Sequence, residues 1–431
     1  MKLLLENIGM LQHAELSLTP LCLIAGENDN GKSTIGKVVF CLIKALNKFQ
    51  DDFRESKERQ LSETAEDIYF LLRNNANGSS ADIIDILREL RLFSRQSINT
   101  PETPSILDNI IQKIFQQVHF ESDVHDKTRA LLLVFKEIFN KPEDTGKFIE
   151  NTFNKVFASE FDNSLLLQGT TEGRIQLLEN SLSLIDLKVT QNGVKLLSDV
   201  EAITLKDATF IETPFILNNH DILVRSQTLF DIDQRRSTAL GQPFTTLHTK
   251  DLFDKLRHPT LPPGLFNENR QKLSNEIQEI INGEISYDRN VRDFIFQRQG
   301  EPISIKNTAS GIKVFGLLNI LINNEFIVKN TLLIFDEPEN HLHPKWQLKL
   351  AEILFKLVES GVYVLISSHS PYLIEALIRA VDSKTSDFAS RFALAENNTI
   401  VDRNRSDDIF SKLAEPFEVF RKMDEELLRD E

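Results

Sequence analysis

Cysteine, tryptophan and long apolar runs are scarce in this sequence of 431 residues. The two cysteines, Cys22 and Cys41, lack the spacing of metal ligands, which excludes a disulfide framework and favours a reducing cytoplasm. No apolar run approaches the roughly 20 residues that a membrane-spanning helix needs, so we expect no membrane association. The N-terminal residues MKLLLENIGM have no long apolar core and no small-residue cleavage site, so we expect no signal peptide.

Positive charge is also in deficit. The sequence contains 49 lysines and arginines and 64 aspartates and glutamates, which gives a formal net charge of −15. An acidic chain of this size is not a general DNA-coating protein, although a local basic groove is compatible with this balance. With 41% hydrophobic and 26% charged residues, the composition is that of a soluble globular protein of about two to three structural units.

Hydrophobic patterning divides the chain into segments of different expected structure. Residues 1–48 fit three short strands, a loop and a helix, residues 300–395 alternate between helices and strands, and residues 164–215 have a β pattern. The other segments are 49–163, a helical insertion with helices at Asp82–Phe93, Ser105–Val118 and Arg129–Phe139; 216–299, an insertion that is loop-rich up to 262 and then helical; and 396–431, a C-terminal helical segment.

A phosphate-binding loop follows the third predicted strand. Residues 26–33, GENDNGKS, fit G-x-x-x-x-G-K-[ST] at every fixed position, with a buried strand before the loop and a helix after it. The glycines let backbone N–H groups surround phosphates, and the helix N-terminus favours negative charge. Lys32 is expected to contact the β- and γ-phosphates, Ser33 to bind Mg²⁺ and Thr34 to approach the α-phosphate. The predicted nucleotide-binding residues here are Gly26, Glu27, Asn28, Asp29, Asn30, Gly31, Lys32, Ser33 and Thr34.

A second motif ends an apolar strand at 331–335 with two carboxylates, Asp336 and Glu337. In a phosphoryl-transfer site, two such carboxylates divide into a metal ligand and a general base. We therefore expect Asp336 to bind Mg²⁺ and Glu337 to activate the attacking water. Acidic residues also follow strands by chance, so this interpretation depends on the phosphate loop upstream.

Two shorter motifs complete the candidate site. His369 follows an apolar strand at 362–366 and could contact the γ-phosphate or position the water; the alternative is an exposed turn histidine. Ser310 and Gly311 begin a predicted helix, where a serine N-cap and free amides could bind an anion; the alternative is a plain helix cap.

These motifs, in this order, resemble those of ABC-type P-loop ATPases, in the branch that includes RecF, SMC proteins and OLD-family ATPases. Thr308–Lys313 is similar to the signature segment, DEPENHLHP at 336–344 to the Walker B and D-loop stretch, and His369 to the switch histidine. The resemblance covers residues 1–48 and 300–380. It implies an α/β fold: an ABC-ATPase-like P-loop head with a mixed β-sheet, a helical lid insertion and a smaller β/loop insertion.

The resemblance also implies a mechanism that uses ATP and Mg²⁺. In this family two heads enclose two ATP molecules, each held by the phosphate loop of one head and the signature segment of the other. Ser310 and Gly311 would then act on the partner's ATP, in a homodimer or a higher homo-oligomer. Ile312 and Lys313 depart from the pattern, because many ABC proteins carry Gly and Gln or Glu there.

The motifs and the resemblance suggest three functions. The first is a sensor or scaffold ATPase for a separate effector, such as a nuclease, in bacterial anti-phage defence; because the segment after His369 is shorter than a domain of about 100 residues, we expect no fused nuclease. The second is a RecF-like DNA-repair ATPase that acts as an ATP-gated DNA clamp, for which the negative charge is unfavourable. A membrane-transporter subunit is disfavoured by the long insertions and by the D-E-P-E-x-x-L-H-P stretch.

Overall fold

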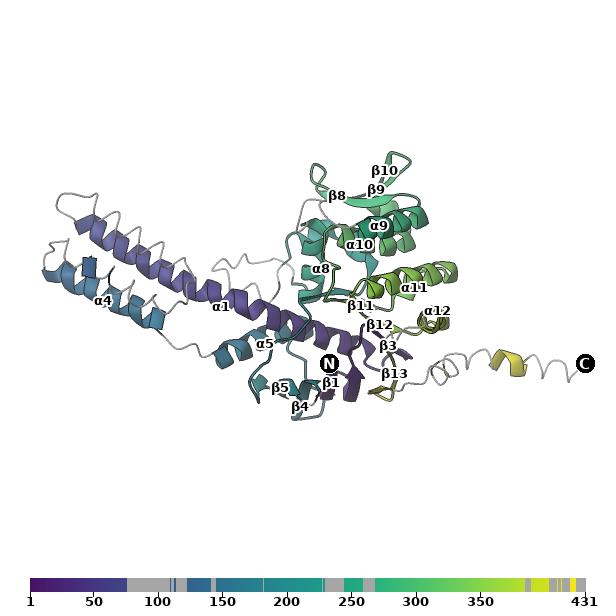
Figure 1. Cartoon of the computed structure of the whole chain (residues 1–431), viewed down its shortest axis with the longest axis horizontal. Coiled ribbons are helices and arrows are strands. Elements are labelled where there is room, and N and C mark those ends of the chain that lie inside the picture. The colour runs from purple at the N-terminus through teal and green to yellow at the C-terminus, as the bar shows by residue number, and fades with distance from the viewer. Residues whose placement is uncertain are drawn as a thin grey trace, which may run out of the picture. The chain divides into compact units, whose positions relative to one another are not determined.

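The computed structural model describes most of the chain, in two compact units (Figure 1). The first unit comprises Met1–Asn47 and Ile149–Glu431, and the second comprises Lys48–Phe148. The described residues are 1–75, 109, 112–113, 122–140, 145–180, 182–226, 228, 244–258, 268–383, 389–402, 409, 412 and 419–423. The predicted helix at Asp82–Phe93 lies outside them, as does the helix at Ser105–Val118 apart from residues 109, 112 and 113. No helix in the described ranges combines the length and the apolar character needed to cross a membrane.

The first unit contains a large mixed β-sheet, which confirms the predicted fold class. The order of its described strands is β6-β5-β4-β1-β2-β14-β13-β3-β12-β11-β7. Their bounds are β1 (Lys2–Ile8), β2 (Leu11–Ser17), β3 (Leu21–Gly26), β4 (Glu172–Glu179), β5 (Leu182–Thr190), β6 (Gly193–Leu196), β7 (Asp207–Ile211), β11 (Thr331–Asp336), β12 (Tyr363–Ser368), β13 (Ser390–Glu396) and β14 (Thr399–Asp402). From β13 to β7 the neighbouring strands run parallel, so their carboxyl ends meet at one edge of the sheet.

Helices cover both faces of the parallel strands. On one face α1 (Lys32–Asn75) packs on β7 and β11, where a Cβ added to Gly36 would lie 2.7 Å from the Phe210 ring and 3.0 Å from Ile334. On the other face, Leu333 and Phe335 join one core with side chains of α10 (Ser310–Asn323), α11 (Pro344–Glu359) and α12 (Pro371–Asp382). Alternate residues of a strand point to opposite faces, so a strand covered on both faces is apolar along its length, as β11 is from Leu332 to Phe335.

Smaller elements complete the first unit. They are α5 (Thr145–Phe161), η1 (Pro214–Asn218), α6 (His220–Leu223), α8 (Leu247–Arg257), α9 (Glu268–Ile281), η2 (Ile305–Asn307), η3 (Pro338–His341), and a three-stranded sheet of β8 (Glu284–Asp288), β9 (Asp293–Arg298) and β10 (Glu301–Ser304).

The described part of the second unit is helical. It includes α4 (Ser122–Asn140), which confirms the helix predicted at Arg129–Phe139. Val124, Thr128, Leu132 and Phe135 of α4 are buried at steps of three and four residues, the spacing of one helix face.

Two predictions of secondary structure are wrong. The stretch expected to be irregular up to residue 262 contains α8, which folds because Leu252, Phe253 and Leu256 bury one face of it. The segment 396–431, expected to be helical throughout, begins with β14; its later residues 409, 412 and 419–423 are helical, and the remainder after 402 lies outside the described residues. Asn397 and Asn398 have positive φ values of 49° and 58°, as in a two-residue hairpin turn, and they return the chain antiparallel to β13.

Candidate active site

The phosphate loop connects β3 to α1, and its two motif glycines pack closely on residues of β13 and β2. A Cβ at Gly26 would lie 2.5 Å from the carbonyl oxygen of Ala395 in β13. A Cβ at Gly31 would lie 2.5 Å from Leu11 Cδ2 in β2, and Gly31 has a φ of +77°, which glycine adopts at little cost. The helix begins at Lys32, so the free amides of its first turn lie at the loop.

Lys32 lies folded over the loop. Its side chain is 4% exposed, and its ammonium donates hydrogen bonds to the carbonyl oxygens of Gly26, at 3.0 Å, and Glu27, at 2.7 Å. The same Nζ lies 3.4 Å from Glu337 Oε1. Lys32 therefore links the two main motifs directly.

Strand register brings the second motif to the phosphate loop. Asp336 of β11 lies opposite Ser367 of β12, and Ser368 of β12 lies opposite Ala25 of β3. The Asp336 carboxylate accepts hydrogen bonds from the hydroxyls of Ser367 and Ser33. Burial raises the pKa of Asp336 above its usual value. The two predicted metal ligands, Ser33 and Asp336, are thus in contact.

Glu337 occupies a left-handed backbone conformation, with φ 44° and ψ 52°, immediately after β11. Its carboxylate accepts a hydrogen bond from Asn340 Nδ2 at 2.9 Å. Partial burial acts to raise the pKa of Glu337, but the Asn340 hydrogen bond and the charges of Lys32 and His369 outweigh it, so the pKa is lowered from its usual value. Glu337 is therefore an ionised carboxylate at neutral pH.

The turn that carries His369 is organised by Glu339, whose role the sequence analysis did not predict. Glu339 Oε1 accepts hydrogen bonds from Ser368 Oγ at 2.7 Å, His369 N at 2.7 Å and Ser370 N at 3.1 Å. His369 Nδ1 then lies 3.5 Å from Glu337 Oε1 and 3.4 Å from Glu339 Oε1. The signal available in the sequence was the second carboxylate of the D-E-P-E stretch.

Ser310 and Gly311 have different neighbours. Ser310 is the first residue of α10 and Ala309 is its N-cap, so the predicted N-cap role of Ser310 is wrong. The Ser310 hydroxyl instead donates to the carbonyl oxygen of His341 at 3.5 Å, and a Cβ at Gly311 would lie 3.0 Å from the Trp346 ring. Among the described residues, no hydrogen bond or ion pair joins Ser310 or Gly311 to the phosphate loop.

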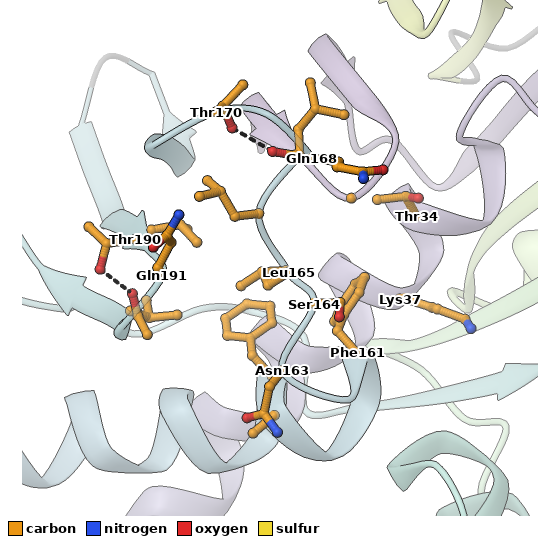
Figure 2. A pocket seen from close by; sticks show the side chains of 18 of the residues that line it. Thr34, Lys37, Phe161, Asn163, Ser164, Leu165, Gln168, Thr170, Thr190 and Gln191 are labelled. Atoms are coloured by element: carbon orange, nitrogen blue, oxygen red, sulfur yellow. Dashed lines mark hydrogen bonds between the residues drawn. The ribbon is translucent and has the colours of Figure 1, made fainter.

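A cavity of about 1130 Å³ begins at the start of α1. Its walls are the β1–β2 turn, the first turns of α1, the end of α5, the segment 163–170 and the β5–β6 turn. Figure 2 shows Thr34 and Lys37 on one side of this cavity and Thr190 and Gln191 on the other. The cavity thus adjoins Ser33 and Thr34, where the phosphate loop enters its helix.

Comparisons with known proteins agree with the motifs. A family model described as AAA ATPase domain matches residues 1–374. A segment of 54 residues is 44% identical to the Old nuclease of Escherichia phage P2, and it covers 12% of this chain and 9% of the length of that protein.

Two solved structures align over nearly the whole chain. The SMC head domain from Thermotoga maritima covers 94% of this chain and 98% of its own, with 11% identity and a TM-score of 0.35. An SMC head bound to the C-winged helix domain of ScpA covers 93% and 96%, with 10% identity and a TM-score of 0.38.

Proposed function

The chain belongs to the AAA ATPase domain family, and from this premise we propose that it binds ATP at the phosphate loop and hydrolyses it with Glu337 as the general base. The observation that supports this most directly lies at the carboxyl edge of the parallel strands. Lys32 Nζ and His369 Nδ1 lie 3.4 Å and 3.5 Å from the same oxygen of Glu337. A cation, an ionised carboxylate and an imidazole on one small surface are the groups that phosphoryl transfer to water needs.

Each group has a role that its surroundings support. The Lys32 ammonium would exchange its two carbonyl acceptors for β- and γ-phosphate oxygens, which are stronger, charged acceptors. The Glu337 carboxylate, ionised at neutral pH, would accept a proton from the attacking water. His369, held by Glu339 through its backbone, would donate a hydrogen bond to the γ-phosphate or hold the water.

The residues present fit Mg²⁺. The Ser33 hydroxyl and the Asp336 carboxylate face each other at the edge of the phosphate loop, and hard oxygen ligands of this kind are those that Mg²⁺ prefers. When bound there, Mg²⁺ would neutralise negative charge on the phosphates. Its approach would also favour the ionised form of Asp336, against the effect of burial.

The nucleoside would occupy the cavity beside Thr34. Once the phosphates lie on the amides at the start of α1, a nucleotide must extend past Ser33 and Thr34, and the cavity opens there. Its volume of about 1130 Å³ is ample for a ribose and a base.

We further propose that two copies of the chain enclose ATP, with Ser310 and Gly311 of one copy acting on the nucleotide of the other. The absence of a hydrogen bond between these residues and the phosphate loop, among the residues that the structure describes, is compatible with action between copies. The resemblance of Thr308–Lys313 to the signature segment supports the same arrangement.

In the cell, this ATPase would act in the cytoplasm as a sensor or scaffold subunit for a separate effector in bacterial anti-phage defence. The motif resemblance to OLD-family ATPases supports this role, and the segment shared with the phage P2 Old nuclease favours a nuclease as the effector. Purification of tagged Glu337→Gln protein from its native locus tests the proposal. A complex with a second protein is expected, whereas a bare homodimer with DNA-stimulated turnover would favour the RecF-like clamp.

The ATP site itself is tested by Lys32→Ala. Because the ammonium is the main cation at the loop, the variant should lose tight ATP binding in a titration with a fluorescent ATP analogue. Lys349→Ala is the control, since Lys349 is half-exposed on α11 and pairs with Glu352 on the same helix. Equal affinity of the Lys32→Ala and wild-type proteins would contradict the proposed site.

A further inference from the structure

Four charged side chains form a cluster beside the candidate active site: Lys37 of α1, Glu160 of α5, Glu212 after β7 and His248 of α8, of which Glu160 and His248 are buried. His248 Nδ1 lies 2.6 Å from Glu160 Oε1, and His248 Nε2 lies 3.3 Å from Glu212 Oε2. Lys37 Nζ also lies between the two carboxylates, 4.0 Å from Glu160 Oε1 and 3.9 Å from Glu212 Oε1. With His248 protonated, two positive charges therefore balance two negative charges.

The setting of His248 favours its protonated form. The His248 side chain is 2% exposed, that of Glu160 is fully buried, and the backbone N–H of His248 also donates to Glu160 Oε2 at 3.1 Å. Burial alone would lower the pKa of His248, but the two carboxylates outweigh it and raise the pKa to about 9. An imidazole that lies between two carboxylates can donate from both ring nitrogens only when it is protonated.

The other ionisable groups near the cluster are separately accounted for. The Cys41 thiol of α1 feels the Glu160 charge, and burial raises its pKa well above its usual value, so it stays neutral. Lys44, which lies over the Phe40 ring that His248 contacts, is held by Asp207 and Asp251. On α8 itself, the Thr249 hydroxyl lies 3.2 Å from His248 Nε2.

The cluster adjoins the site on two sides. Ile211 of β7 lies opposite Phe335 of β11, so Glu212 comes level with Asp336 at the same sheet edge. The charge of Glu212 contributes to the raised pKa of Asp336. Lys37 lines the cavity one turn after Ser33, so the cluster borders both the catalytic edge and the cavity.

We propose that His248 is a positioning residue that neutralises and holds Glu212 beside Asp336, so that an anionic nucleotide can bind at this edge. The proposal rests on the proposed ATP site. If His248 loses its proton or is replaced, the cluster keeps two carboxylates against the single charge of Lys37. The excess negative charge then lies next to Asp336 and opposes both the triphosphate and its metal ion.

Steady-state ATP hydrolysis by the full-length chain between pH 6.5 and 10 tests the proposal. His248→Gln should raise KM for ATP on the order of tenfold, because one unit of negative charge is uncovered. In the wild type, kcat/KM should fall as the pH rises through about 9, and this decrease should be absent in His248→Gln. His220→Gln is the matched control, since His220 is also buried but contacts Tyr287, away from the cluster.

A double variant separates charge from structural damage. His248→Gln with Glu212→Gln restores charge balance, so its KM should return to within about threefold of the wild-type value. The proposal would be overturned if the double variant had a higher KM for ATP than His248→Gln. It would also be overturned if His248→Gln kept the wild-type KM and the wild-type decrease of kcat/KM near pH 9. Absence of Lys32-dependent hydrolysis in the wild type would instead contradict the proposed function.

The exposed member of the cluster provides a test if His248→Gln does not fold. Glu212 is 47% exposed, so Glu212→Gln should fold normally, as a thermal melt will establish. His248 then has one carboxylate partner instead of two, which lowers its pKa, so the decrease in kcat/KM should occur at lower pH than in the wild type. If kcat/KM of Glu212→Gln decreases at the same pH as in the wild type, the proposal would also be overturned.

Discussion

Replacing Gly31 with alanine should damage the phosphate loop through two separable costs. The φ of +77° is unfavourable for alanine by about 1–2 kcal/mol. The new Cβ would also lie 2.5 Å from Leu11 Cδ2 and 2.7 Å from Leu11 Cγ, and overpacking of this kind costs about 1–3 kcal/mol. The two costs total about 2–5 kcal/mol. If the loop keeps its shape, this cost lowers the free energy of unfolding; if the loop changes shape to relieve the clash, the cost appears as weaker ATP binding.

Both quantities can be measured on one sample. Urea unfolding followed by the fluorescence of Trp346, the single tryptophan, reports stability, and titration with a fluorescent ATP analogue reports affinity. Gly300→Ala is the matched control, because Gly300 has a φ of +84° and no atom within 4 Å of the added Cβ, so it incurs the backbone cost alone.

The clash has a specific rescue. In a Leu11→Ala background, Cγ and Cδ2 are absent, so Gly31→Ala should then cost no more than Gly300→Ala. A clash with Leu11 is contradicted if Gly31→Ala equals Gly300→Ala in stability and retains wild-type ATP affinity, or if the Leu11→Ala background leaves the cost of Gly31→Ala unchanged.

Three further predictions concern the surroundings of the site. The pKa of His248 is raised to about 9 from its usual 6.5, so its protonation should stabilise the fold by about 3 kcal/mol. This stabilisation should be complete below pH 6.5 and lost as the pH rises through 9. Urea unfolding should therefore show a free energy of unfolding that decreases over this pH range in the wild type and not in His248→Gln. Glu339→Ala removes the shared acceptor of three hydrogen bonds, of whose donors Ser370 N keeps a second acceptor, the Ser368 hydroxyl at 3.1 Å. The variant should lower the free energy of unfolding by about 2–4 kcal/mol in the same assay, whereas a change below 0.5 kcal/mol, roughly the effect of an ordinary surface substitution, would contradict the assigned contacts. Ser310→Arg should leave ATP binding by single chains intact and abolish ATP-dependent dimers in light scattering; loss of binding by the monomer would indicate that Ser310 acts within its own chain.

The phosphate loop and the strand ending in Asp336 could be predicted because their signals are local. A fixed glycine spacing and a continuous apolar run are visible within ten residues, and the strand–loop–helix order adds the context. The family match confirms the resemblance to RecF/SMC/OLD-like ATPases that these motifs carried. The contact between Lys32 and Glu337 joins residues that follow β3 and β11, the two parallel strands on either side of β12.

What the sequence analysis missed depends on contacts between distant residues. Glu160 and His248 are 88 residues apart in the chain, and neither belongs to a motif. Helix α8 was missed because the surrounding prolines suggested loop, while its stability comes from a buried face supplied by other elements. Ser310 was expected to be an N-cap from its residue type alone, but its hydroxyl contacts His341, which only the folded chain brings near.

In the proposed mechanism, Glu337 activates water for ATP hydrolysis at this site. The most direct measurement is the turnover of Glu337→Gln with ATP and Mg²⁺, alongside its ATP affinity. We expect an ATP affinity within about threefold of wild type and a kcat lower by about a hundredfold or more, because the amide cannot accept the proton from water. Wild-type turnover by Glu337→Gln, with intact ATP binding, would contradict it.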